Sequence, residues 1–218
     1  MGTILLVRHG QAMTGAADYD LLSPLGEQQA GLVGSELDRR GTRPTRILSG
    51  TLRRQRQTAE GASLACGWGP AVESEPDWNE FDHSDVLEVA GHPGSPLDAA
   101  LRERAVSPLD TAIPRWSSGL HDYAYAEPFT DFTTRVQRGL RRLAADLGAG
   151  ETAVVFTSAG VIAWIAAALT SGGEPQWRAL NRVVVNSSIS KVVVGRRGTT
   201  LISYNEHAHL APTAVTYS

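Results

Sequence analysis

The stretch Thr3-Ile4-Leu5-Leu6-Val7-Arg8-His9-Gly10-Gln11 decides the fold of this chain. Its first five residues are apolar or β-branched and predict a short buried strand that ends as Arg8 and His9 begin. In α/β sheets the ligand sites usually lie at such strand-to-loop edges. An imidazole beside a fixed cation suits attack on a phosphoryl group, because the charge spread over the transferring oxygens must be neutralised. Gly10 lets the backbone approach a ligand there.

The segments that follow alternate between strand and helix patterns. Ser23-Pro24 begins a helix, with Ser at the cap and Pro at the first helical position, and Gly41 ends it. Residues 46–49 predict a second strand, 51–66 a second helix and 71–73 a third strand. This order predicts an α/β fold, a three-layer α/β/α sandwich with a mostly parallel mixed sheet.

The stretch from Glu75 to Pro128 breaks this alternation and holds most of the prolines. We expect an irregular, partly helical insertion there, lying over the active site. Regular patterns then return, and they predict a helix over 129–147, a strand over 152–157 and a buried helix over 159–169. The chain is expected to form a single domain over residues 1–218.

Three short β-branched or apolar runs predict the last strands: Val183-Val184-Val185, residues 190–194 and residues 201–203. Gly195 to Gly198 between two of them is typical of a hairpin turn. Part of the sheet is therefore expected to be antiparallel.

Composition excludes several classes of protein. The net charge of −3 and the pI near 6.1 give no electrostatic match to nucleic acid or to an anionic membrane. Cys66 is the single cysteine, which rules out an internal disulfide and fits a reducing compartment. The start resembles no signal peptide, and the longest apolar run, Val161–Leu169, is too short to span a bilayer. We expect a cytoplasmic protein.

A second chemical signal is the run Arg53-Arg54-Gln55-Arg56 at a strand-to-helix junction. Arginines in the first turn of a helix are unfavourable against the helix dipole, and a bound anion would remove that mismatch. The ordinary alternative is a solvated basic face. This alternative fits Arg53 or Arg56, but it hardly fits all three arginines of the run together.

A third signal is Trp78-Asn79-Glu80-Phe81-Asp82-His83. An acid between aromatic residues can have its pKa raised by desolvation, so that Glu80 would donate a proton near neutral pH. The alternative is an ordinary surface acid in a loop.

Together the motifs Leu6–Gln11, Leu21–Ala30, Leu52–Ala59 and Glu80 resemble the histidine phosphatase superfamily, also called the phosphoglycerate-mutase-like family. The resemblance covers nearly the whole chain, with the motifs in the expected order. It implies the three-layer fold with an insertion over the active site.

The resemblance also implies roles. His9 is similar to the nucleophile that becomes phosphohistidine, and Arg8 and Arg54 to its phosphate clamps; Arg54 stands four residues before Thr58, where the family places its arginine. Glu80 is similar to the general acid that later acts as base. Gln11 and Ser23 would line the substrate side. No metal or organic cofactor is implied, because the arginines supply the charge.

The family pattern breaks at a second histidine, whose place within Val154–Ile162 is taken by Ser158. A serine at a helix N-terminus can hydrogen-bond a phosphate oxygen but supplies no positive charge. Another histidine could compensate: His209 or His207 after the last strand, or His83 beside the acid. Otherwise the pocket works with fewer charges on an undemanding substrate, or the chain only binds phosphorylated ligands.

Two other interpretations are weaker. Ser158 as a serine nucleophile lacks the first glycine of the nucleophile elbow. A metal at His207-Ala208-His209 lacks a carboxylate or cysteine cluster to complete it. The sequence therefore predicts hydrolysis of a small phosphomonoester through His9, with inorganic phosphate as the other ligand, no metal, and Ser158 and His209 among the substrate-binding residues. The different-class alternative is a phospho-ligand-binding or regulatory protein, a mutase is less favoured, and a homodimer is left open.

Overall fold

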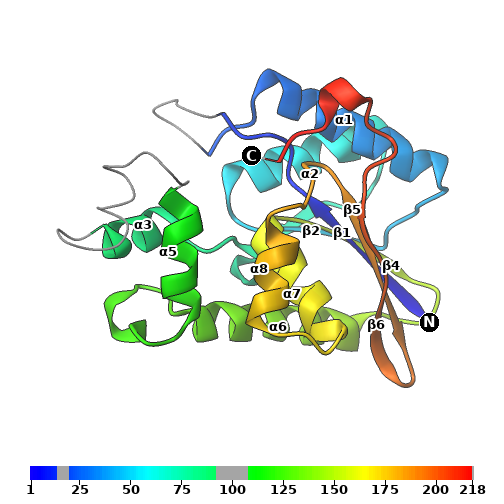
Figure 1. The fold of residues 1–218 in the computed structure, drawn as a ribbon. Coiled ribbons are helices and arrows are strands. Elements are labelled where there is room, and N and C mark those ends of the chain that lie inside the picture. The colour runs from blue at the N-terminus through cyan, green and yellow to red at the C-terminus, as the bar shows by residue number, and fades with distance from the viewer. Residues whose placement is uncertain (14–19, 92–107, 218) are drawn as a thin grey trace. The chain divides into compact units, whose positions relative to one another are not determined.

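The computed structural model describes residues 1–13, 20–91 and 108–217, and its centre is a mixed sheet with the strand order β3-β2-β4-β1-β5-β6 (Figure 1). The strands are β1 (Gly2–Arg8), β2 (Arg46–Ser49), β3 (Val72–Ser74), β4 (Thr152–Thr157), β5 (Ile189–Gly195) and β6 (Gly198–Glu206). β1 to β4 are parallel to one another, whereas β5 is antiparallel to both β1 and β6. The predicted mixed, mostly parallel sheet is confirmed.

Helices cover both faces of this sheet (Figure 1). On one face lie α1 (Pro24–Arg39) and α2 (Arg53–Cys66); on the other lie α7 (Ala159–Leu169), α8 (Glu174–Asn181) and α6 (Phe129–Asp146) from Val136 onward. Ser23 caps α1, because its hydroxyl accepts a hydrogen bond from Gly26 N at 3.0 Å. The predicted three-layer α/β/α architecture is confirmed. None of the helices within the described ranges combines the length and apolar character that crossing a membrane requires.

The apolar side chains follow the strand periodicity. One face of the sheet and the two helices over it form a cluster of fully buried residues, which includes Leu5, Val7, Val33, Leu37, Ile47, Ala62, Val154 and Phe156. Successive strand residues point to opposite faces, so Ile4 and Leu6 are buried on the other side. This packing fixes the register, in which Arg8 lies opposite Thr157 and Ser49 opposite Phe156. The carboxyl ends of β1, β2 and β4 therefore meet at one edge of the sheet.

The chain divides into two compact units. The first, Met1–Glu80 with Val136–Ser218, holds the sheet; the second is Phe81–Arg135 and contains α3 (His83–Ala90), α5 (Pro108–Ser117) and the first turns of α6. Aromatic rings in tilted and edge-to-face contacts form the core of the second unit: Phe81, Trp116, Phe129 and Phe132. The predicted insertion falls mostly within this unit, and its residues 92–107 lie outside the described ones. The single-domain organisation and the insertion's place over the site stay predictions.

One predicted strand is wrong. Val183-Val184-Val185 follows α8 as a turn and an irregular segment, although three consecutive β-branched residues favour a strand. Two of its carbonyls are engaged by side chains and the third by a turn: Val183 O accepts from Asn205 Nδ2, Val184 O from Arg8 Nη1 and Val185 O from Ser188 N. Helix α8 just before it has no counterpart in the sequence prediction.

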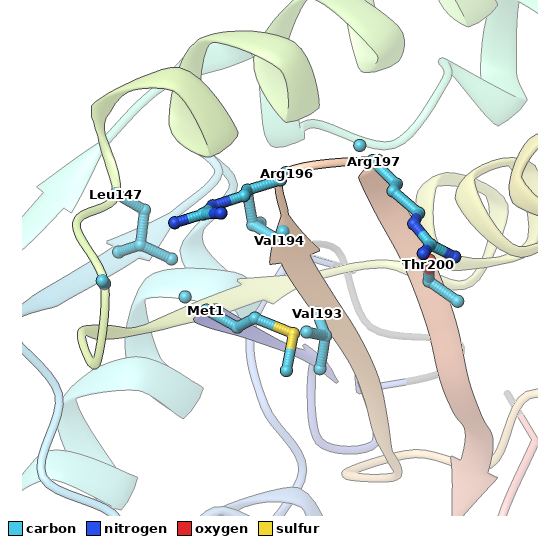
Figure 2. Close-up of a pocket in the computed structure, with 11 residues that line it drawn as sticks. Met1, Leu147, Val193, Val194, Arg196, Arg197 and Thr200 are labelled. Atoms are coloured by element: carbon cyan, nitrogen blue, oxygen red, sulfur yellow. The ribbon is translucent and has the colours of Figure 1, made fainter.

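The other end of the sheet is hollowed. A cavity of about 760 Å³ lies between the β5–β6 hairpin, Met1 and the segment after α6 (Figure 2). Val193, Val194 and Leu147 form its apolar wall, and the exposed Arg196 and Arg197 stand at the hairpin turn. This end lies one sheet length away from Arg8, because Gly2 at the opposite end of β1 pairs with Val194.

Candidate active site

The loop from Arg8 to Gln11 is held at every backbone polar group. In chain order, its N–H groups donate to Ser188 O at 3.1 Å, Thr157 O at 2.8 Å, Thr58 Oγ1 at 3.0 Å and Gln29 Oε1 at 2.7 Å. Its carbonyls pair, in the same order, with Ser187 N, Asn186 Nδ2, the His9 ring and Ser23 N. Buried backbone groups need such partners, and a full set leaves the loop one conformation.

Gly10 has a packing role in this loop. A β-carbon on Gly10 would lie 2.4 Å from Gly26 O, and one on Gly26 would lie 2.1 Å from Gln11 O. The loop and the first turn of α1 therefore touch backbone to backbone, which only glycine allows on both sides. The sequence predicted that Gly10 lets the backbone approach a ligand. In the structure Gly10 lets the loop approach the backbone of α1 at Gly26.

The ring of His9 is oriented by its own loop. Nδ1 lies 2.7 Å from Gly10 O, and only 5% of the residue is exposed. A carbonyl oxygen can only accept, so Nδ1 is assigned the proton and Nε2 the lone pair. Nε2 in turn accepts from Arg54 Nε at 3.3 Å. The available nitrogen of His9 therefore faces a guanidinium.

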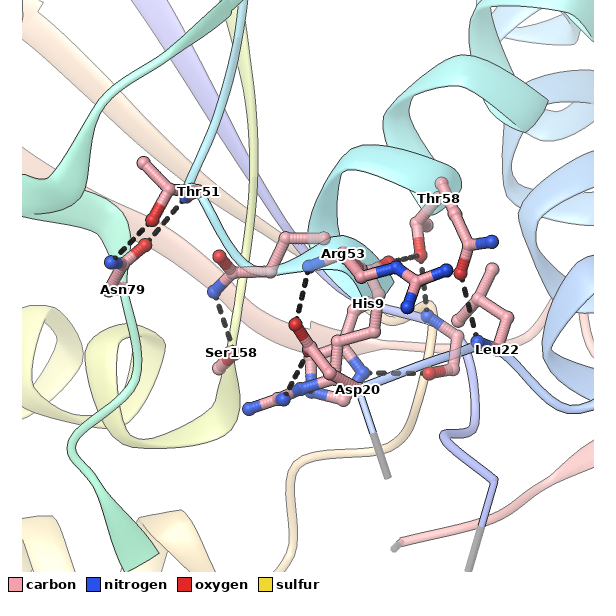
Figure 3. A network of polar contacts seen from close by, with 12 residues as sticks. His9, Asp20, Leu22, Thr51, Arg53, Thr58, Asn79 and Ser158 are labelled. Carbon is pink, nitrogen blue, oxygen red and sulfur yellow. Dashed lines mark hydrogen bonds and ion pairs between the residues drawn. The ribbon is translucent and has the colours of Figure 1, made fainter. Parts of the chain in front are cut away.

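The two predicted phosphate clamps are both buried, at 7% exposure each. Arg8 Nη1 donates to Val184 O, which ties the side chain to the segment before β5. Arg54 lies in the first turn of α2, beside His9, and its Nη1 forms an ion pair with Asp20 Oδ1 at 2.7 Å. The structure thus brings Arg54 and His9 into contact from two different strand-to-helix junctions. Figure 3 shows His9 beside Asp20, the partner of Arg54.

Glu80 is buried at 9% exposure, and its Oε2 accepts from Gly160 N at 2.8 Å. Gly160 lies in the first turn of α7, where free N–H groups and the helix dipole stabilise a negative charge. Ser158 is the N-cap residue of the same helix and is fully buried. Its Oγ accepts a hydrogen bond from Gln55 Nε2 at 2.8 Å (Figure 3). Glu80 and Ser158 therefore both lie at the start of α7.

A protein-family model matches nearly the whole chain. The model of the histidine phosphatase superfamily (branch 1) matches residues 4–207. The chain belongs to this superfamily. A search among curated proteins found no match.

Solved structures share the histidine phosphatase fold over nearly the full chain. YhfR of Bacillus stearothermophilus has a TM-score of 0.73 at 19% identity, covering 96% of this chain and 99% of that one. A mycobacterial glucosyl-3-phosphoglycerate phosphatase, in a complex with VO3, has 0.65 at 24% identity, covering 94% and 99%. Phosphoglycerate mutase of Bacillus anthracis has 0.66 at 18% identity, covering 95% and 94%. A phosphatase and a mutase thus share this architecture, so the likeness shows the fold and does not identify the reaction.

The remaining predicted site residues lie at different distances from His9. Gln11 and Ser23 contact each other, since Ser23 Oγ donates to Gln11 Oε1 at 2.8 Å. His209 is partly buried beyond β6, and its charged neighbours are Glu36, Arg40 and His207. Burial lowers the pKa of His209, which favours a neutral ring and gives no support to a compensating charge.

Sequence reasoning missed a polar network behind His9. Asn186 donates to His9 O, and its Oδ1 accepts from Thr216 Oγ1 at 2.9 Å. Thr216 Oγ1 accepts from Gln29 Nε2 at 2.9 Å, while Gln29 Oε1 holds Gln11 N. The chain's last described segment thereby ties both flanks of the loop Arg8–Gln11 together. The only sequence signal is a polar run, Asn186-Ser187-Ser188, directly before an apolar strand.

Asp20 and Gln55 were also missed. Asp20 contacts Arg54, and Gln55 joins Ser158 to Trp78 O through its amide nitrogen. Gln55 lies inside the predicted arginine run, but nothing local distinguishes it from a helix-surface glutamine. Within the described ranges, no group of three or more His, Cys, Asp or Glu side chains could hold a metal ion.

Proposed function

We propose that this chain hydrolyses phosphomonoesters through a phosphohistidine on His9. The observation that carries the proposal is the orientation of the His9 ring: Nδ1 lies 2.7 Å from Gly10 O, which can only accept, so the lone pair is assigned to Nε2, beside the buried Arg54 guanidinium. A nucleophile aimed at a fixed cation suits a phosphoryl group better than any other electrophile. Membership of the superfamily and a phosphatase among the structural neighbours support the same reaction class.

In the first step, Nε2 of His9 attacks phosphorus and the bond to the leaving oxygen breaks. Glu80, in its protonated form, gives that oxygen its proton, and the first turn of α7 then stabilises the carboxylate that remains. Arg8 and Arg54 neutralise the equatorial oxygens, which is the main contribution a protein makes to phosphoryl transfer. The ring becomes positively charged on phosphorylation, and Gly10 O stabilises the Nδ1–H end of that charge.

In the second step, Glu80 takes a proton from water as the water attacks phosphorus. The phosphorus–nitrogen bond breaks, its electron pair returns to Nε2, and inorganic phosphate leaves. Glu80 can serve both steps because the carboxyl group regains in the second step the proton it gave in the first. Gln11 and Ser23 are proposed to contact the substrate beyond the phosphoryl group.

We infer that Ser158 replaces the family's second histidine and that the site works with one positive charge fewer. Loss of one stabilising donor costs on the order of 10²–10³ in rate in comparable sites. Gln55 supports a neutral substitute, because its amide already holds the Ser158 hydroxyl. A slow phosphatase, or one whose substrate has a good leaving group, fits this arrangement better than a mutase, which must retain its covalent intermediate.

A second candidate function is binding of phosphorylated ligands without turnover. The observation that favours it is the Ser158 hydroxyl, which is buried and engaged by Gln55. Because Gln55 donates to the Ser158 oxygen, the hydroxyl keeps its own hydrogen for a phosphate oxygen, but it brings no positive charge to a transition state.

The test compares the native chain with His9→Ala on p-nitrophenyl phosphate, in the presence of a metal chelator. The proposal expects release of inorganic phosphate by the native chain and none by the variant. Equal background from both would overturn it, and phosphate binding by the native chain would then support the second candidate. A mutase would instead isomerise a phosphorylated substrate and depend on a bisphosphate primer.

A further inference from the structure

Asp20 holds two donors at the start of α2 with one carboxylate. Its Oδ1 accepts from Arg54 Nη1 at 2.7 Å, and its Oδ2 accepts from the backbone N–H of Arg53 at 2.8 Å (Figure 3). The Asp20 side chain is 29% exposed and that of Arg54 is 9% exposed. The contact therefore lies at the mouth of the site, where solvent screens it only in part.

The contact selects one edge of the guanidinium. Arginine offers a fork of two parallel N–H groups on its Nε–Nη2 edge, which matches the oxygens of a phosphoryl group. Asp20 occupies Nη1, on the other side of the group, while Nε faces His9 Nε2 at 3.3 Å. The fork of Arg54 is thereby turned toward the atom that would carry phosphorus.

The same carboxylate replaces a missing helix cap. The N-cap residue of α2 is Leu52, whose side chain makes no capping hydrogen bond. A capping side chain usually satisfies one of the free N–H groups of the first turn. Here Asp20 reaches Arg53 N from a distant part of the chain. The start of α2 and the Arg54 side chain therefore share one anchor.

We propose that Asp20 is a positioning residue that fixes the Arg54 fork for the transition state; this rests on the proposed hydrolysis through His9. Its negative charge lies beside the position of a bound phosphate, so it weakens binding of the free anion. It also removes the rotamer freedom of Arg54, so the donors need no reorganisation when charge develops on the transferring oxygens. Asp20 thus favours catalysis over ground-state binding, which is the discrimination that raises kcat.

Asp20→Ala tests this with two substrates and one ligand. The proposal expects kcat to fall by about 10- to 100-fold and equally for an aryl ester, p-nitrophenyl phosphate, and an alkyl ester, glycerol phosphate. Inorganic phosphate, titrated calorimetrically, is expected to bind as tightly as before or up to about tenfold more tightly. Asp20→Asn keeps the shape and one acceptor, so its loss of kcat should be smaller. Glu27→Gln, which removes an exposed carboxylate from the first turn of α1, is the matched charge control and should change neither quantity.

Three results would overturn the proposal. An unchanged kcat in Asp20→Ala would show that Arg54 needs no anchor. A loss confined to the alkyl ester would make Asp20 a proton donor, since only that leaving group needs a proton. A parallel loss of kcat, phosphate affinity and Tm in both Asp20 variants would reduce Asp20 to a helix cap.

An NMR measurement separates this proposal from the hydrolysis on which it rests. The Nε–H signal of Arg54, assigned by its disappearance in Arg54→Lys, reports orientation without turnover. It should be sharp in the native chain and broadened in Asp20→Ala. If the native chain has no His9-dependent turnover but the signal responds in this way, the proposed function fails and the anchoring contact stands. If turnover depends on His9 and the signal is identical in both proteins, the anchoring proposal fails alone.

Discussion

Arginines lie at both ends of the same sheet, but the two ends differ in the burial of these side chains and in what holds them. At the carboxyl end of β1, Arg8 and Arg54 are 7% exposed and are held by Val184 O and Asp20. At the other end, Arg196 and Arg197 are exposed on a hairpin turn beside a cavity of about 760 Å³ (Figure 2). The hollow end has its cations in solvent, whereas the buried end has cations with one orientation. Fixed orientation, more than cavity size, is what phosphoryl chemistry requires.

The two ends also differ in how their polar groups are satisfied. Around the loop Arg8–Gln11 the fully buried residues include Asn186, Ser187, Thr157 and Ser158. Burying such groups costs free energy unless each one finds a partner, so an extensive network is needed to hold them. The hollow end has an apolar wall of Val193, Val194 and Leu147 and needs no such network. We make four predictions about this contrast, in decreasing order of the effect expected.

The sharpest contrast is between two arginine deletions. Arg54→Ala should lower kcat/KM by on the order of 10²–10³, because it removes a donor to the transferring phosphoryl group. Arg197→Ala removes the same charge from the hollow end and should leave kcat/KM within about twofold, since screened surface charges at that distance contribute little. Steady-state kinetics on p-nitrophenyl phosphate measure both. Similar losses from the two variants would mean that net charge, and not the buried geometry, sustains activity.

Two glycines of α1 test the close backbone contact between this helix and the loop Arg8–Gln11. Gly26→Ala would place a β-carbon 2.1 Å from Gln11 O, and we expect a loss of about 1–3 kcal/mol in the free energy of unfolding. Gly31 lies in the same helix with nothing within 4 Å of the added carbon. Gly31→Ala should therefore gain roughly 0.5–1 kcal/mol from the lower entropy of the unfolded chain. Urea unfolding measures both, and effects of the same sign would contradict the packing account.

Asn186 tests the network behind the loop. Asn186→Asp keeps the shape and the acceptor for Thr216 Oγ1 but loses the N–H that holds His9 O. We expect kcat to fall roughly tenfold, because the nucleophile loses part of its support. Thr216→Val removes the next group of the network and should have a smaller effect in the same direction. An Asn186→Asp enzyme with native kcat would show that the remaining loop hydrogen bonds suffice.

The smallest effect is expected from His209. Burial lowers its pKa below the ordinary value of 6.5, so the unfolded chain binds the proton more readily than the folded one. This contribution to stability is fully present above that ordinary value and is lost as the pH falls through it toward the lower pKa of the folded state. His209→Gln should make the free energy of unfolding fall less steeply between pH 7 and pH 5. At pH 8 the variant should leave the free energy of unfolding unchanged. An unchanged slope would contradict the assignment.

Much of the fold follows from local sequence. The bounds predicted for β2, β4 and α7 agree with the structure, because each has a strong apolar pattern between clear stop signals. Ser23-Pro24 predicts the start of α1 for the same local reason. The strand predicted at 183–185 is wrong because, among the described residues, no neighbouring strand pairs with this valine run, and strand formation depends on such a partner more than on propensity.

Only those site residues whose type and position after a strand indicate a chemical role could be predicted from the sequence. His9 directly follows β1 and Arg54 lies in the run after β2, so the contact between the two could be expected before the structure. Asp20 and Asn186 act through partners far along the chain, 34 residues away for Asp20 and 177 for Asn186. No local pattern encodes such a contact, and an isolated acid or amide near a turn has an ordinary explanation.

Direct trapping of the covalent intermediate tests the central claim. The native chain would be mixed with p-nitrophenyl phosphate, quenched in alkali within one turnover, and measured by intact mass spectrometry followed by peptide mapping. We expect a mass increase of one phosphoryl group, stable in alkali, lost in acid, mapped to His9 and absent from His9→Ala. Turnover with no phosphorylated peptide, or with the phosphoryl group on any other residue, would contradict the account.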